Sequence, residues 1–278
     1  MKPTRRGALQ LFAAAPGVLS RKGRSAVTKY VRFRHGTKTA HGILDGETIR
    51  ELRDSPFEGV HETGAKHRLA EVKLLAPCQP PKILAVGLNY RSHLGDRKAP
   101  ERPEIFYKPI TSLQHPDESI VIPPDATDVH YEGELVVVIG KPTKNVTVEK
   151  ARDHIFGVTC GNDVSERQWQ NGANKDLQWW RAKGADTFAP CGPVIVQGLD
   201  YGKVLLQTRL NGEVVQKQVT SDLIFDCPTI VSHISRFVTL MPGDLIYTGT
   251  PGQTRKMKPG DVVEVEIEGI GVLKNKVA

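Results

Sequence analysis

The sequence has no long apolar run and no closely spaced pair of cysteines. A membrane-spanning helix needs roughly 18 consecutive apolar residues, and no stretch of the 278 residues approaches that length, so we expect no membrane span. The cysteines Cys78, Cys160, Cys191 and Cys227 form no C-x-x-C pair, which argues against a thiolate zinc site. We interpret them as small buried hydrophobic residues, and the sequence leaves open a disulfide between two of them.

Acidic residues are absent from residues 1–26, which contain six basic residues. Because the whole chain has a formal net charge of +7, the remaining residues carry only about +1 (7 − 6). This near-neutral body gives no electrostatic reason to expect a nucleic-acid partner. Arg5 and Arg6, followed by the apolar residues 11–15, resemble a twin-arginine export signal. A cytoplasmic protein with a basic N-terminal tail is our first interpretation, and periplasmic export is the alternative.

Strand patterns dominate the sequence, and helical patterns are few. Alternating or β-branched residues predict strands at 28–34, 39–44 and 48–52, which together indicate a small β-rich unit over residues 27–75. Pro77, Pro80 and Pro81 then mark a boundary.

Residues 76–278 continue with the same preference for strands. Further strands are predicted at 83–87, 105–109, 155–160, 204–210, 214–219, 245–248 and 262–267, with short helices near 147–153 and 165–170 and a longer one at 227–238. The sequence therefore predicts an α+β fold that is mainly β, with mixed or antiparallel sheets rather than repeated βαβ units.

Two glutamates precede the most apolar of these segments. Glu132 and Glu134 share one face of any strand that contains them, and Asp163 follows the predicted strand at 155–160. Three carboxylates in one place would repel one another unless a hard cation such as Mg²⁺, Mn²⁺ or Ca²⁺ lies between them. The alternative is a solvated strand edge whose charges prevent aggregation.

The residues quoted next carry a resemblance to a known family. They are Gly87-Leu88-Asn89-Tyr90-x-x-His93, Phe106-x-Lys108-Pro109, Glu132-x-Glu134-Leu135, Asp163-Val164-Ser165, Trp180-x-x-Lys183-Gly184 and Thr248-Gly249-Thr250-Pro251. Six motifs in this order resemble the fumarylacetoacetate hydrolase family over roughly residues 76–278. The resemblance implies a catalytic domain with the family's mixed β-roll or sandwich, a divalent metal (usually Mg²⁺ or Mn²⁺), and a homodimer. It also implies small-molecule substrates that are 2-oxo acids or 1,3-dicarbonyl acids.

The resemblance assigns roles to individual residues. It implies Glu132, Glu134 and Asp163 as metal ligands and Lys183 as a catalytic residue. It implies four substrate contacts, namely Lys108, Arg167, Gln170 and Thr250. Ordinary surface or turn roles remain the alternatives for these four and for Lys183.

His93 is the position at which this chain departs from the family pattern. Hydrolytic members pair this histidine with a glutamate three residues later, whereas this chain has Asp96, with Glu101 further along the same loop. We treat His93 and Asp96 as a candidate catalytic dyad and His130 as a structural residue.

The predicted function is metal-dependent C–C bond hydrolysis of an acylpyruvate through a stabilised enolate. Keto–enol tautomerisation of an oxaloacetate-type acid, or decarboxylation, at the same site is the alternative. The departure at Asp96 weighs against hydrolysis and toward tautomerisation. A non-catalytic metal-binding or ligand-binding protein is a third hypothesis, against which the intact set of acids and Lys183 argues.

Overall fold

The computed structural model describes residues 27–278, so the predicted basic tail or export signal at 1–26 lies outside the described residues. Within the described part, no helix is both long and apolar enough to cross a membrane. All four cysteines are free and buried, as expected for small hydrophobic side chains.

Twelve strands form the main sheet. They are β1 (Thr28–His35), β2 (Lys38–Asp45), β3 (Thr48–Leu52), β4 (Glu62–Arg68), β5 (Lys73–Leu75), β6 (Ile83–Gly87), β7 (Glu104–Lys108), β8 (Leu113–Gln114), β10 (Gly133–Ile139), β11 (Ile155–Asn162), β13 (Ala189–Gln197) and β16 (Leu245–Tyr247). Ten of them follow the order β4-β3-β2-β1-β13-β11-β10-β16-β6-β7, while β5 pairs with β1 and β8 pairs with β13. The N-terminal strands are therefore hydrogen-bonded to the rest of the sheet through β1 and β13.

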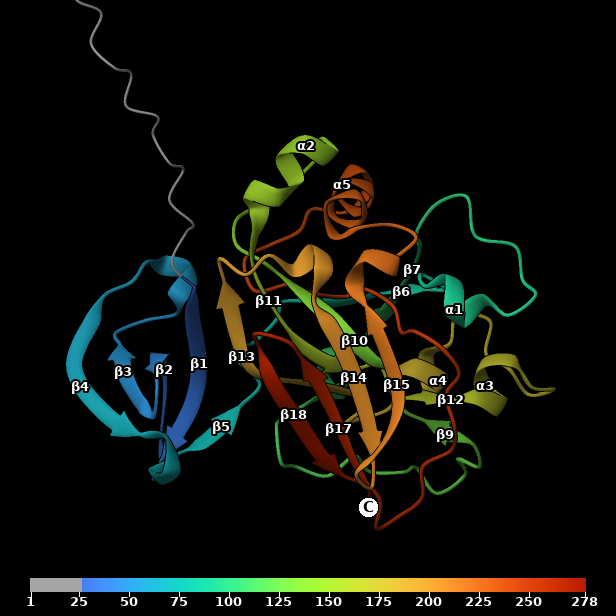
Figure 1. Cartoon of the computed structure of the whole chain (residues 1–278), viewed down its shortest axis with the longest axis horizontal. Helices are drawn as coiled ribbons and strands as arrows, with labels where there is room; N and C mark the ends of the chain where they lie inside the picture. Colours follow the sequence, from blue (N-terminus) through green and yellow to red (C-terminus); the bar gives the residue numbers. More distant parts are fainter. Residues whose placement is uncertain (1–26) are drawn as a thin grey trace, which may run out of the picture.

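A second sheet packs against this one. It has the order β15-β14-β17-β18, and a separate short pair joins β12 to β9. Their bounds are β9 (Val129–His130), β12 (Ser165–Glu166), β14 (Leu205–Leu210), β15 (Glu213–Val219), β17 (Val262–Ile267) and β18 (Gly271–Lys276). Figure 1 shows β14, β15, β17 and β18 beside β10, β11 and β13, with β1–β4 at the opposite side of the molecule.

The α-helices are short except for one. They are α1 (Arg91–Leu94), α2 (Val148–Ala151), α3 (Arg167–Asn171), α4 (Trp180–Gly184) and α5 (Cys227–Phe237). The Asp226 carboxylate accepts a hydrogen bond from the backbone N–H of Thr229 at 2.9 Å and so caps the start of α5. This helix buries the side chains of Ile230, Val231 and Ile234. Each of them contributes roughly 1.5–3 kcal/mol of hydrophobic stabilisation.

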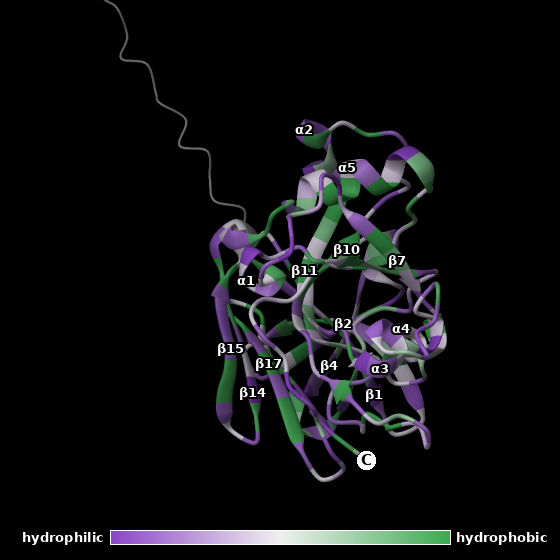
Figure 2. Cartoon of the chain, turned by 90° about the vertical axis from the view of Figure 1, so that its right-hand side faces the viewer, coloured by the Kyte–Doolittle hydropathy of each residue, from purple (hydrophilic) through white to green (hydrophobic). Residues whose placement is uncertain are grey.

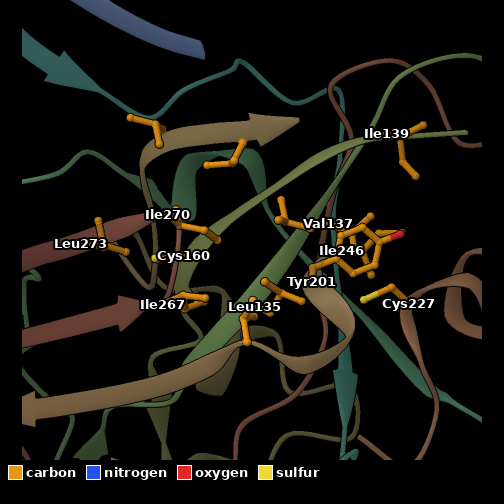
Figure 3. Packing of buried hydrophobic residues seen from close by; sticks show 14 of the residues in the cluster. Leu135, Val137, Ile139, Cys160, Tyr201, Cys227, Ile246, Ile267, Ile270 and Leu273 are labelled. Carbon is orange, nitrogen blue, oxygen red and sulfur yellow. The ribbon is translucent and has the colours of Figure 1, made fainter. Parts of the chain in front are cut away.

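The alternation of β10 explains how a core strand also supplies a polar site. Leu135, Val137 and Ile139 point into the core between the two sheets, together with Ile246 and Ile267 (Figure 3). The intervening side chains point to the opposite face, where Val136 and Val138 join a second apolar cluster. Glu134 belongs to this second set by its position in the strand.

The predicted α+β, mainly β fold of this family type is confirmed, although the sequence did not indicate several of the strands, among them β4, β13 and β18. Figure 2 shows β10 as largely hydrophobic and the polar helix α3 as hydrophilic, in agreement with the patterns used for prediction. β13 was missed because Pro190 and Pro193 argue against a central strand. β18 was missed as well, and residues 165–170 begin as the strand β12 before α3 starts.

Candidate active site

Strand pairing brings the three predicted carboxylates together. In the antiparallel pair β10–β11, Gly133 lies opposite Asn162 and Glu134 lies opposite Gly161. The backbone N–H of Asp163 donates to the Glu132 carbonyl at 2.9 Å. As a result, carboxylate oxygens of Glu132, Glu134 and Asp163 lie within 4.8 Å of one another, and the three residues are only 4%, 1% and 1% exposed.

Two glycines leave room for this arrangement. A Cβ atom on Gly133, between the two glutamates, would lie 2.0 Å from Oγ1 of Thr208 in the second sheet. A Cβ on Gly161 would lie 2.4 Å from Val136 and 2.5 Å from the Tyr247 ring. Any larger residue at either position would push apart the strands that position the carboxylates.

Three cationic side chains neutralise two of the three acids. Lys183 Nζ lies 2.8 Å from Glu132 Oε2 and 2.7 Å from Asp163 Oδ2. Arg167 Nη2 lies 2.6 Å from Glu132 Oε1. Lys108 Nζ donates to the other oxygen of Asp163 and to the Lys183 carbonyl. Glu134 instead accepts a hydrogen bond of 2.6 Å from the backbone N–H of Gly249.

This uneven pairing separates the pKa values of the acids. Burial raises the pKa of Glu132, but the charges of Lys183 and Arg167 outweigh burial and hold it well below its ordinary value. Burial and the negative charges of Asp163 and Glu132 raise the pKa of Glu134 well above its ordinary value. Burial lowers the pKa of Lys183, yet Asp163 and Glu132 together raise it. Within residues 27–278, Glu134 is therefore the one acid of the three that forms no ion pair with a cationic side chain.

A pocket of about 450 Å³ opens in front of these groups. Glu132, Asp163 and Lys183 line it with the predicted substrate contacts Arg167, Gln170 and Thr250. Arg167 is held in place by Gln170, whose Oε1 accepts from Nη1 at 2.7 Å.

Lys108 and Thr250 are attached more to the protein than to the pocket. Lys108 does not line the pocket: its side chain is fully buried behind Asp163. Burial lowers its pKa, while Asp163 acts in the opposite direction. The Thr250 hydroxyl donates to the Gly133 carbonyl at 2.9 Å, so this threonine also fixes the start of β10.

The structure places His93 in the pocket but does not bring Asp96 to it. The His93 Nδ1–H donates to the Gly252 carbonyl at 2.5 Å, and the ring lines the pocket. Asp96 is exposed and lies outside the pocket lining. Among the hydrogen bonds and ion pairs of residues 27–278, none joins His93 to Asp96 or Glu101; Glu101 pairs with Lys98. The bond to Gly252 leaves Nε2 of His93 as the basic ring nitrogen.

Several residues of the pocket were not predicted as site residues, among them His130, which the sequence analysis treated as structural. His130 lines the pocket, and its Nε2 lies 2.9 Å from Asp128 Oδ1 while its Nδ1 lies 2.9 Å from Thr254 Oγ1. Arg167 Nη2 donates to the same Thr254 hydroxyl at 2.7 Å. Thr254 gave no signal in the sequence, because its contacts lie far away along the chain. Phe106 and Trp179 also line the pocket. Phe106 belongs to the quoted motif Phe106-x-Lys108-Pro109, whereas Trp179 precedes the motif Trp180-x-x-Lys183-Gly184 and was given no role.

Comparison with known proteins identifies the group to which this site belongs. The family model described as fumarylacetoacetate (FAA) hydrolase C-terminal matches residues 82–278. The chain belongs to the fumarylacetoacetate hydrolase family. A second family model, described as Rv2993c-like, N-terminal, matches residues 28–77.

Relatives with different activities share this family fold. The mitochondrial oxaloacetate tautomerase FAHD2A of Bos taurus is 41% identical over 221 residues, which cover 75% of this chain and 70% of that protein. The crystal structure of a 2-hydroxyhepta-2,4-diene-1,7-dioate isomerase from Mycobacterium marinum is 42% identical with a TM-score of 0.84, covering 90% of this chain and 98% of that one. A fumarylacetoacetate hydrolase from Exiguobacterium antarcticum is 34% identical with a TM-score of 0.81, covering 90% and 99%.

The family and the site together identify an enzyme of hydrolase or isomerase type. The buried acidic cluster fits a divalent metal by its own chemistry. It offers three oxygen donors within reach of one ion, and it contains one carboxyl, Glu134, whose pKa is raised by burial and by the negative charges of Asp163 and Glu132. Hard oxygen donors of this kind suit Mg²⁺, Mn²⁺ or Ca²⁺ rather than softer metals.

Proposed function

We propose that this enzyme catalyses keto–enol tautomerisation of a small 2-oxo acid of the oxaloacetate type, with Mg²⁺ or Mn²⁺ as cofactor. The observation that carries the proposal is the environment of His93. Its Nδ1–H is bound to a backbone carbonyl rather than to a carboxylate, so it lacks the acidic partner that a water-activating dyad uses. Proton transfer to and from a substrate carbon does not need that dyad.

Glu132, Glu134 and Asp163 are the proposed metal ligands. A divalent ion bound there supplies positive charge beside the carboxylate and carbonyl oxygens of a 2-oxo acid. In the octahedral geometry of Mg²⁺, three carboxylate ligands would leave about three positions for water or substrate oxygens. Ca²⁺ would also accept these oxygens, so the metal is to be determined by titration.

Arg167, Gln170 and Thr250 are the proposed substrate contacts. Arg167 offers two parallel N–H groups, the geometry that suits a carboxylate. Its present acceptors Glu132, Gln170 and Thr254 hold the guanidinium at the pocket wall. Lys108 acts behind the pocket: its ammonium fixes Asp163 and does not meet the substrate.

Lys183 and His93 are the proposed proton-transfer groups. In tautomerisation a proton leaves C3 and another is added to the C2 oxygen. The basic Nε2 of His93 would accept the first, and the Lys183 ammonium, charged between Glu132 and Asp163, would donate a hydrogen bond or a proton to the oxygen. The raised pKa of Lys183 keeps this group in its donor form.

Hydrolysis of an acylpyruvate is the second candidate. His93 lines the pocket, and the Exiguobacterium relative with the same fold is named a hydrolase. Decarboxylation of oxaloacetate would use the same metal and the same cations. A purely binding role is disfavoured because the proton-transfer groups surround the acidic cluster.

One assay separates these functions. Purified enzyme with Mg²⁺ or Mn²⁺ is mixed with the enol form of oxaloacetate, and loss of enol absorbance is followed together with release of CO₂. In parallel, acetylpyruvate is added and free acetate is measured by NMR. Enol loss without CO₂ or acetate is the expected result; acetate release would replace the proposal by hydrolysis, and CO₂ release by decarboxylation.

We also propose that the protein is a cytoplasmic homodimer with an N-terminal unit at 27–75 and a catalytic domain at 76–278. The homodimer is supported by membership of the fumarylacetoacetate hydrolase family, whose resemblance implies that assembly. Light scattering during size-exclusion chromatography measures the mass directly, and a mass of one chain would contradict the dimer.

A further inference from the structure

Two cavities meet at one aromatic wall. The catalytic pocket of about 450 Å³ and a second cavity of about 890 Å³ are both lined by Phe106 and Trp179. The second cavity is also lined by Tyr107, Ile110 and Trp180, whose side chains are exposed. Phe106 and Trp179 are the two residues that both linings share, so they form the boundary between the polar, catalytic pocket and a more apolar cavity.

The backbone of Trp179 is unusual for so large a residue. It is left-handed, with φ 57° and ψ 22°, a conformation that side chains with a Cβ adopt only when their surroundings enforce it. Leu88 has φ 56° and lines the same catalytic pocket. Two bulky residues in this conformation at one pocket indicate that their side chains are aimed there despite a local cost.

The Trp179 indole lies against Phe106 and near Gly87, and the backbone of the same residue begins α4. Its ring packs edge-on against Phe106, with 5.5 Å between the ring centroids. Its Cζ3 lies 3.9 Å from the position of a Cβ on Gly87, at the end of β6. The Trp179 carbonyl accepts the Lys183 N–H at 2.9 Å, so the same residue begins the helix that carries Lys183.

The wall stands beside the reacting groups. Lys183 Nζ lies 5.2 Å from the centre of the Phe106 ring, a cation–π distance. Phe106 therefore lies next to the ammonium, and Trp179 packs against Phe106. The apolar chain of a substrate whose 2-oxo acid end is held by the metal ligands and Arg167 would meet these rings, since Phe106 and Trp179 are the largest apolar side chains in the pocket lining.

We propose that Trp179 sets the upper length of the acyl chain that the pocket accepts. This inference rests on the proposed function, since it takes a 2-oxo acid as the ligand. Short 2-oxo acids fit in front of the indole. A longer chain meets the ring, and only removal of the ring joins the pocket to the apolar cavity behind it.

The test is a chain-length series measured by binding, not by turnover. Calorimetry with Mg²⁺ compares pyruvate, 2-oxobutanoate, 2-oxohexanoate and 2-oxooctanoate on three proteins: wild type, Trp179→Asn and Trp180→Asn. Asparagine tolerates the left-handed backbone, so the first variant removes the ring and keeps the turn. Trp180 is 67% exposed and lines only the second cavity, which makes it the matched control. Trp179→Phe, a smaller aromatic ring, is used as well, so that the test does not depend on one variant folding.

In the wild type and in Trp180→Asn, affinity should stop rising at a short chain. In Trp179→Asn it should continue to rise by about fourfold per added methylene, the factor expected for burial of a CH₂ group, and Trp179→Phe should lie between. The same length limit in all four proteins, or an equal change in Trp180→Asn, would overturn the partition. If the wild type shows these length limits in binding but no turnover in the enol, CO₂ and acetate assay described above, the proposed function alone is refuted. Absence of any 2-oxo acid binding by the wild type would overturn both.

Discussion

Strands hold one side of the catalytic pocket, and loops hold the other. Glu132, Glu134 and Asp163 lie at the paired ends of β10 and β11, almost completely buried. His93 lies on the four-residue helix α1 and is fixed by a carbonyl in the loop after Thr250. Substitutions of the strand residues should therefore weaken metal binding, because these buried ligands cannot move to compensate. Substitutions of the loop residues should slow the reaction and leave metal affinity unchanged.

Glu134→Gln should produce the largest effect and would break the strand side. The amide can still accept the Gly249 N–H, but it cannot supply the negative charge that a divalent cation requires. We expect Mg²⁺ binding by calorimetry to disappear and kcat/KM to fall by about 10³-fold or more, several kcal/mol of lost charge stabilisation. Because burial and its acidic neighbours raise the pKa of this carboxyl and so disfavour its charged form in the metal-free protein, an uncharged amide should be tolerated there, and the thermal midpoint without metal should change little.

Glu51→Gln is the matched control for this variant. Glu51 is also a buried carboxylate, 5% exposed, but it is paired with Lys38 and His67 in the N-terminal strands. It should lose some stability and keep metal affinity. Unchanged Mg²⁺ affinity in Glu134→Gln would show that this residue is not a ligand.

His93→Gln tests the loop side and should have the second-largest effect. Glutamine keeps a donor for the Gly252 carbonyl but removes the basic nitrogen, so kcat should fall by about 10²-fold, within the range for loss of a general base. Mg²⁺ affinity should stay at the wild-type value.

Ser92→Ala tests whether His93 acts as a general base or only holds the loop at Gly252. The Ser92 hydroxyl accepts the Gly252 N–H at 3.0 Å, one residue away from His93 and on the same loop contact. If Ser92→Ala slows the reaction as much as His93→Gln does, the imidazole acts as a loop anchor and not as a base.

The sequence predicted the strand side of the site much better than the loop side. The two-residue period of a strand places Glu132 and Glu134 on one face, and the end of an apolar strand places Asp163 nearby, so local rules were sufficient. The partner of His93 is Gly252, which is 159 residues away along the chain. No period or spacing reports a contact between two loops, and the family pattern pointed to Asp96 instead.

The same distinction explains the residues and strands that were missed. Trp179 lines the pocket only because β6, β7 and α4 come together around it, and the sequence does not report this contact between distant segments. β13 is central in the sheet and yet contains Pro190 and Pro193, which local preference places outside central strands. Hydrogen bonding to β11 and β1 stabilises this strand despite its low local preference for a central position.

The pH dependence of metal binding should be a smaller effect that sharpens the view of the strand side. Glu134 holds a proton below its raised pKa, and a metal must displace that proton. Mg²⁺ affinity should therefore fall as pH decreases below this pKa, by up to about tenfold per pH unit, and become independent of pH above it. Calorimetry in two buffers of different ionisation enthalpy should find about one proton released per metal bound. Affinity that does not change on acidification, with no proton released, would show either that Glu134 is already ionised before the metal binds or that it is not a ligand.

Asp96→Asn should have the smallest effect, and it tests whether the loop side closes further than the structure shows. Asp96 is exposed and lines no part of the pocket. Among the hydrogen bonds and ion pairs of residues 27–278, none joins it to His93. An exposed carboxylate without a partner contributes little to a distant group in water, so kcat should change by less than about twofold, as should that of Glu101→Gln. Comparing Asp96→Asn with His93→Gln on each substrate shows whether Asp96 takes part in the reaction. If Asp96→Asn loses as much activity as His93→Gln on acetylpyruvate, but not on the enol of oxaloacetate, the loop must bring Asp96 to His93 during hydrolysis, and tautomerisation would then be only one of two reactions at this site.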